Sequence, residues 1–72
     1  MDTDRILRVV KESLRLDDFP TLEDDQKTLK NWDSINHLYL IMNLEKEFGV
    51  KFEMSKIPDL TSIAAIEREL TQ

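Results

Sequence analysis

The sequence contains no cysteine and no apolar run long enough to cross a bilayer. Without cysteine, neither disulfides nor a thiolate metal site can stabilise the fold. A membrane-spanning helix needs about 18 consecutive apolar residues, so we expect no insertion into a membrane. The chain begins with Met1, Asp2, Thr3 and Asp4, an acidic start that is unlike a secretory signal. These absences together predict a cytoplasmic protein.

Seventy-two residues leave room for one small domain, which we expect to span residues 1–72. A chain of this size buries only about 60% of its unfolded surface, so we expect modest stability. Fifteen acidic residues against ten basic ones give a net charge of −5. This balance disfavours binding to nucleic acid, which needs Lys and Arg to displace counterions from phosphates. It fits either recognition by basic protein partners or solubility alone.

Apolar residues recur at helical spacing in three segments, which predicts a small all-α bundle. We expect helices over residues 4–15 and 34–48, a last helix starting at residue 61 or 62, and a short turn of helix at residues 54–57. The long loop over residues 16–33 should be held on the bundle by apolar side chains, because loops of this length are rarely free. These are Leu16, Phe19, Leu22, Leu29 and Trp32. Its acidic residues lack the spacing of an EF-hand, so we predict no metal site.

The segment that leads into the second helix contains the clearest local signals. Asp33 is a good N-cap residue, because its carboxylate can accept a hydrogen bond from an N–H of the first turn. Gly49 suits the left-handed residue that ends a helix. The apolar side chains between them cover more than half of the helix circumference, so we expect neighbours on both sides. They are Ile35, Leu38, Tyr39, Ile41, Met42, Leu44 and Phe48.

Ser34 follows the predicted cap and lies in the first turn, where backbone N–H groups lack acceptors and the helix dipole is positive. An anion esterified to its hydroxyl would be stabilised there. Serine is also common at helix starts for structural reasons alone. By position, Ser34 is therefore either a helix-start residue or an attachment point for a phosphodiester.

The chain resembles the acyl carrier protein family over essentially its whole length, as far as Thr61–Ile66 in the last helix. The resemblance is strongest in the motif Asp33-Ser34-Ile35 and in the later run Leu44-Glu45-Lys46-Glu47-Phe48-Gly49-Val50. In that family, an Asp-Ser-Leu motif begins the second helix, and its serine carries a 4′-phosphopantetheine arm. The resemblance thus favours the attachment-point interpretation of Ser34.

The resemblance also implies partners. A phosphopantetheinyl transferase would move the arm from coenzyme A to Ser34 with magnesium present, and Asp33 would assist recognition. The thiol of the arm would then carry an acyl group as a thioester between acyl-activating or acyl-transferring enzymes of a fatty-acid, polyketide or related pathway. The protein itself would be a monomeric carrier and not an enzyme. An unmodified adaptor with the same fold is the alternative.

His37 lies three residues after Ser34, a spacing at which two side chains can meet on a helix. A Ser–His hydrolase would also need a strained nucleophile turn, a residue that orients the base and an oxyanion hole. No Gly-x-Ser-x-Gly surrounds Ser34, so we predict no catalytic residue and a surface position for His37. Trp32 is expected either to plug the space between loop and helices or to contact a partner, and both roles are open for Tyr39.

We expect contacts with partner enzymes near Ser34 and along the second helix. The candidates are Trp32, Ile35, Asn36, His37, Tyr39, Met42, Glu45 and Glu47. Family members that serve fatty-acid synthesis usually carry several acidic residues on this face, whereas here acid returns only at Glu45 and Glu47. This departure predicts a dedicated carrier for one pathway. Five residues, Met42 again among them, are expected either to part and shelter an apolar chain or to form ordinary core, namely Leu38, Ile41, Met42, Ile63 and Ile66.

Overall fold

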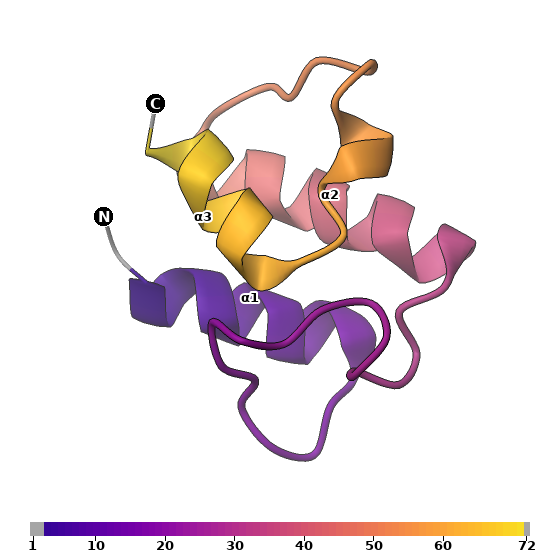
Figure 1. Cartoon of the computed structure of the whole chain (residues 1–72). Helices are drawn as coiled ribbons and strands as arrows, with labels where there is room; N and C mark the ends of the chain where they lie inside the picture. Colours follow the sequence, from indigo (N-terminus) through magenta and orange to yellow (C-terminus); the bar gives the residue numbers. More distant parts are fainter. Residues whose placement is uncertain (1–2, 72) are drawn as a thin grey trace.

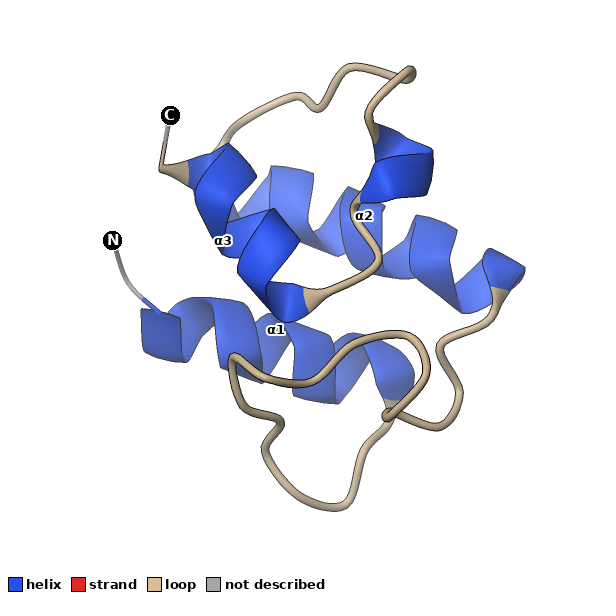
Figure 2. Ribbon diagram, in the orientation of Figure 1, coloured by secondary structure: helices blue, strands red, loops and turns tan. Residues whose placement is uncertain are grey.

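The computed structural model describes residues 3–71 and contains three α-helices and one short 3-10 helix. These are α1 (Thr3–Leu14), α2 (Ser34–Phe48), η1 (Ile57–Asp59) and α3 (Ile63–Leu70). Over residues 3–71 there is no β-strand, only an isolated bridge between Asp25 and Ser62. Figures 1 and 2 show the helices and the long loop that joins α1 to α2. The predicted all-α class, helix order and long first loop are therefore confirmed. No helix of the described chain is both long and apolar enough to cross a bilayer.

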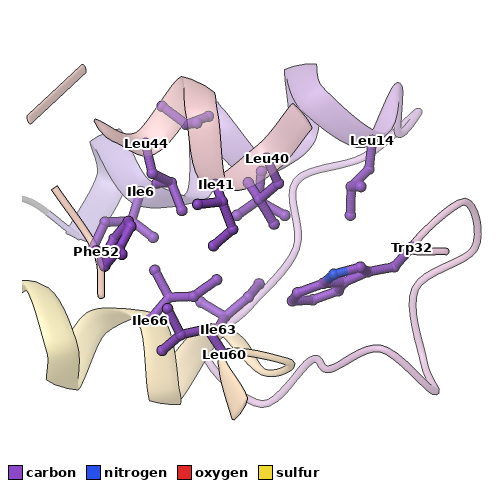
Figure 3. Close-up of a cluster of buried hydrophobic side chains, with 12 residues drawn as sticks. Ile6, Leu14, Trp32, Leu40, Ile41, Leu44, Phe52, Leu60, Ile63 and Ile66 are labelled. Atoms are coloured by element: carbon purple, nitrogen blue, oxygen red, sulfur yellow. The ribbon is translucent and has the colours of Figure 1, made fainter. Parts of the chain in front are cut away.

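The buried side chains form one cluster to which all three α-helices contribute (Figure 3). Its fully buried members are Ile6, Val10 and Leu14 from α1, Leu40 and Leu44 from α2, and Ile63 and Ile66 from α3. α1 packs against both α2 and α3, so α1 is the element that the other two share. α2 contacts α1 and, through His37, also η1, but the apolar row on its outer face is exposed. The width of an apolar stripe on a helix does not show how much of that stripe the rest of the chain buries.

The helix ends follow local capping rules closely. α1 ends at Leu14, one residue earlier than predicted, because Arg15 adopts a left-handed φ of 55° and the Leu16 N–H donates to Lys11 O at 2.9 Å. α2 has the predicted bounds, and Gly49 ends it with a φ of 63°. α3 begins after Ser62, whose hydroxyl accepts a hydrogen bond from the Ala65 N–H at 3.1 Å.

The short helix lies slightly later than predicted. Residues 54–56 form a turn, and the 3-10 helix spans Ile57–Asp59 with Pro58 in its first turn. Proline is tolerated at the start of a helix, because the N–H that it lacks would have no intrahelical acceptor there. Pro58 therefore does not break the helical turn.

The long loop is attached differently from what its apolar residues predict. Trp32 is buried, and Leu16 and Leu29 pack against the core, as expected. Phe19 and Leu22 are 61% and 41% exposed, so the prediction that they hold the loop is wrong.

Backbone hydrogen bonds secure the middle of the loop instead. The Gln26 N–H donates to Thr61 O at 2.9 Å, and the Ile63 N–H donates to Asp24 O at 3.1 Å. These bonds fasten the loop to the residues that begin α3, and no apolar pattern in the sequence encodes them.

Asp24 organises the same part of the loop through its side chain. Its carboxylate accepts hydrogen bonds from the Thr21 N–H at 2.8 Å and from the Thr28 hydroxyl at 2.9 Å. These donors favour the ionised form and lower the pKa of Asp24 below its usual value. The ionised carboxylate therefore stabilises the fold above its unfolded-state pKa, and this contribution is lost as the pH falls through the folded pKa.

Candidate functional site

Ser34 is exposed and is the first residue of α2. The residue before it, Asp33, has an extended backbone and accepts a hydrogen bond from the Asn36 N–H through Oδ1 at 2.9 Å. The Asp33 carbonyl accepts the His37 N–H at 2.8 Å and so begins the hydrogen-bond pattern of the helix. Asp33 is thus the predicted N-cap, and it fixes the backbone on which Ser34 sits.

The surroundings of Ser34 favour a negative charge. Across residues 3–71, the N–H groups of Ser34 and Ile35 and the Ser34 hydroxyl have no protein hydrogen-bond partner. These N–H groups point out of the positive end of the α2 dipole. Asp33 contributes one carboxylate here, but that group already accepts a hydrogen bond from Asn36. The start of α2 can therefore stabilise an anion that is bonded to the Ser34 oxygen.

Asn31 connects the site to α1. It adopts a left-handed φ of 70°, which asparagine tolerates better than most residues. Its side-chain amide donates to Leu14 O at 2.9 Å, and its carbonyl accepts the Asn36 amide at 2.8 Å. The end of α1 is thereby tied to the first turn of α2. No pattern in the sequence predicts this role, and the only local signal for it is an asparagine two residues before the cap.

His37 is buried, with 8% of its surface exposed, so the prediction of a surface position is wrong. The Trp32 indole Nε1–H donates to His37 Nδ1 at 2.9 Å, and His37 Nε2 lies 2.8 Å from Ile57 O. An indole can only donate and a carbonyl can only accept, so Nδ1 accepts the Trp32 N–H and Nε2 donates to the Ile57 carbonyl. His37 thus joins the end of the loop, the start of α2 and η1 in one buried network.

This network also decides the roles of Trp32 and His37. Trp32 is 4% exposed and packs in the core (Figure 3), which confirms that it fills the space between loop and helices. Both ring nitrogens of His37 are engaged by Trp32 and Ile57, so His37 offers no free base to Ser34. Neither side chain is offered at the surface, and a Ser–His catalytic pair is not formed.

The remaining predicted contact residues divide into two groups. Ile35, Tyr39 and Met42 are more than half exposed on the outer face of α2, and Leu38 joins them there at 55% exposure. Glu47 instead pairs with Arg5 at 3.0 Å, and the Glu45 carboxylate accepts the Phe52 N–H at 2.9 Å.

Asn36, the other polar candidate, is also engaged within the chain. It is half-buried, and its side-chain amide donates to Asn31 O. Of the predicted contact residues, Ile35, Tyr39 and Met42 are therefore the ones that are exposed and whose side chains make no hydrogen bond or ion pair within the described chain.

One other feature of the surface lies away from Ser34. A depression of about 540 Å³ on α1 is lined by Asp4, Arg5, Leu7, Arg8 and Phe19. Two of these residues, Arg5 and Arg8, pair with Glu47. The described residues include no group of three or more His, Asp or Glu side chains placed to hold a metal ion. Size alone therefore does not identify the functional site in this protein.

We expect Asp33→Ala to lower the free energy of unfolding by about 1 kcal/mol, because the Asn36 N–H loses its acceptor. For a domain of this size, that change lowers Tm by about 4–8 °C. Asp33→Asn is the matched control, because its side-chain oxygen can still accept the bond. Thermal unfolding followed by circular dichroism measures both. Equal losses for the two variants would show that the cap bond is not what Asp33 contributes.

The described residues define a class: an all-α protein that presents a capped, exposed serine and whose one histidine is bound to other groups of the chain. Chloroplastic acyl carrier protein 1 of Spinacia oleracea is 33% identical to this chain over 61 residues. That match covers 83% of this chain and 44% of the spinach protein, so the chain spans less than half the length of this relative. It confirms the resemblance to the acyl carrier protein family that the sequence motif predicts. No family model and no solved structure matches the chain.

Proposed function

We propose that this protein is an acyl carrier whose Ser34 is esterified by 4′-phosphopantetheine. The observation that carries the proposal is the position of Ser34, exposed at the positive end of α2 directly after its capping residue. The 33% identity to an acyl carrier protein over 83% of the chain supports it. On this proposal, residues 1–72 are a single carrier domain that acts as a monomer in the cytoplasm.

The transfer of the arm requires only a nucleophilic oxygen from this chain. The Ser34 oxygen would attack the diphosphate of coenzyme A at the phosphorus nearer the pantetheine. That step forms a phosphodiester, releases adenosine 3′,5′-bisphosphate and passes the serine proton to a base of the transferase. His37 does not act as this base, because it is committed to Trp32 and Ile57. The catalytic residues thus belong to the transferase, and the carrier is its substrate.

The start of α2 fits the attached group. The free N–H groups of the first turn face the region where the phosphodiester charge would sit, and the dipole stabilises that charge. When attached, the arm supplies a thiol that holds an acyl group as a thioester. Asp33 and Asn31 hold the first turn in place, so the chain positions and presents the arm to the acyl-activating and acyl-transferring enzymes of one biosynthetic pathway.

An adaptor that never receives an arm is the second candidate function. It is favoured by one observation, the exposed apolar row of Ile35, Leu38, Tyr39 and Met42, which would bind a protein without any prosthetic group. The two functions differ in the covalent state of Ser34, so the mass of the protein separates them.

The deciding experiment is intact-mass spectrometry after incubation with coenzyme A, magnesium and a broad-specificity phosphopantetheinyl transferase. We expect a gain of one phosphopantetheinyl unit in the native sequence, complete loss of that gain in Ser34→Ala, and no loss in Ser55→Ala. Ser55 is the matched control, because it is exposed but lies in the turn before η1. If several transferases that modify a known carrier leave this protein unchanged, the adaptor function is favoured. A gain that survives Ser34→Ala would place the arm elsewhere.

A further inference from the structure

The layer between α2 and α3 begins close to Ser34. Both helices pack on α1, and buried side chains fill the space between them. His37 is the first buried residue of α2, and the buried Trp32 lies two residues before Ser34. Figure 3 shows the Trp32 ring at one end of the layer. The shortest way from an arm on Ser34 into the core therefore leads past Trp32 and His37.

A polar network spans the layer at this point. His37 Nδ1 accepts the Trp32 indole N–H at 2.9 Å, and His37 Nε2 donates to the Ile57 carbonyl at 2.8 Å. The two rings also stack, with their centroids 6.1 Å apart and their planes inclined by 27°. Because both side chains are buried, water does not compete for these hydrogen bonds. The network thus joins the end of the long loop, α2 and η1 across one edge of the core.

Other polar contacts between the elements lie at the surface. Asn43 on α2 donates to Ser13 Oγ on α1 at 2.8 Å, and Arg5 pairs with Glu47 at 3.0 Å. When such exposed contacts open, water replaces the lost partner, so opening them costs little. A buried donor or acceptor finds no such replacement. The network around His37 is therefore harder to open than these surface contacts.

We infer that the network of Trp32, His37 and Ile57 bars the acyl chain of the arm from the core, so that this carrier holds its cargo outside the bundle. The inference rests on the proposed function and adds the class of cargo. An alkyl chain that enters beside the first turn of α2 must part His37 from Ile57 and displace the Trp32 ring. The chain can neither donate nor accept a hydrogen bond, so the separated groups stay unpaired in an apolar layer. A chain kept outside suits a short or polar acyl group, because each methylene left in water costs free energy.

Loading Ser34 with an octanoyl arm tests the inference. The transferase and octanoyl-coenzyme A attach the arm together with its acyl group, and the protein with the unacylated arm is the reference. A chain that binds only the native state would raise stability. We expect the Tm of the octanoyl form to lie within about 1 °C of the reference. An isotope-labelled octanoyl chain should show no nuclear Overhauser effects to the methyl groups of Ile63 and Ile66, which are fully buried in the core.

A double variant removes the network. Trp32→Phe with His37→Leu replaces two paired polar side chains by apolar ones, a change that can be nearly neutral for stability. In this variant, octanoylation should raise Tm by about 4 °C or more, and Overhauser effects to Ile63 should appear. Asn43→Ala is the matched control, because it removes a hydrogen bond between two helices at the surface and should leave the chain outside. Circular dichroism verifies that each variant is folded.

The outcomes separate this inference from the function on which it rests. A stabilised octanoyl form of the unsubstituted protein, with Overhauser effects to Ile63 or Ile66, overturns the inference and leaves the carrier function intact. A folded double variant that keeps the chain outside also overturns it, because the network is then not what bars the chain. If the double variant does not fold, the two measurements on the unsubstituted protein decide between a barred and an open core. Failure of the unsubstituted protein to gain the mass of the octanoyl arm, with a transferase that modifies a known carrier, removes the function itself.

Discussion

Replacing His37 by alanine should lower the free energy of unfolding by about 2–4 kcal/mol. The substitution empties a buried site, and it leaves the Trp32 indole N–H and the Ile57 carbonyl without their partner. A buried polar group that loses its hydrogen bond costs about 1–3 kcal/mol. For a chain of 72 residues, total stability is about 4–10 kcal/mol, so the loss is a large fraction of the whole.

Urea unfolding followed by circular dichroism measures this loss, and Tyr39→Ala is the matched control. Tyr39 is an aromatic residue on the same helix but is 55% exposed, so its removal should change stability far less. In a Trp32→Phe background, His37→Ala should cost about 1 kcal/mol less than in the unsubstituted protein, because the indole donor is already absent. Equal costs in the two backgrounds would show that the Trp32–His37 hydrogen bond does not stabilise the fold.

The burial of His37 shows where prediction from sequence fails in this protein. Ser34 and His37 are three residues apart on one helix, and this spacing alone is compatible with two side chains that meet at the surface. The partners that decide the matter are Trp32 and Ile57, and Ile57 lies 20 residues away and belongs to η1. A histidine can be buried only if both of its nitrogens find partners, and a pattern confined to one helix cannot reveal partners on another element.

The features that were predicted correctly are those encoded within a few residues. Asp33 and Gly49 fix both ends of α2 through hydrogen bonds and backbone angles that each involve one turn of chain. The same local logic places Ser34 in the first turn of α2, where the structure has it. The left-handed conformation of Asn31, in contrast, depends on how the loop returns from α1, so its role in holding the site could not be derived from composition or periodicity.

The exposed apolar row on α2 illustrates a different limit. Helical periodicity correctly identified Ile35, Leu38 and Met42 as members of an apolar stripe, but it could not tell which part of that stripe faces the core. A helical wheel shows which residues share a face of α2, but it does not show which face meets another element. In the fold, the side of α2 that carries Leu40 and Leu44 is buried, and α2 packs against α1. The part that remains exposed is the part that borders Ser34.

Replacing Ile66 by alanine should produce an effect of similar size to that of His37→Ala, through the core alone. α3 has only eight residues, and isolated helices shorter than about 12–15 residues are marginal in water. Its stability therefore depends on Ile63 and Ile66, which are fully buried against the other helices (Figure 3). Truncating a buried isoleucine to alanine costs about 2–5 kcal/mol, which is enough to leave part of this small domain unfolded at physiological temperature.

Two further variants on α3 make this prediction specific. Ile66→Val removes one methylene and should cost only about 0.5–1.5 kcal/mol, and Arg68→Ala, on the exposed side of α3, should change stability by less than about 0.5 kcal/mol. Urea unfolding measures all three under the same conditions. If Ile66→Ala and Arg68→Ala have the same midpoint, α3 does not depend on burial of Ile66 for its stability. If the three stabilities follow the predicted order, the loss in Ile66→Ala extends to the long loop. The reason is that Asp24 and Gln26 are hydrogen-bonded to the residues that begin α3.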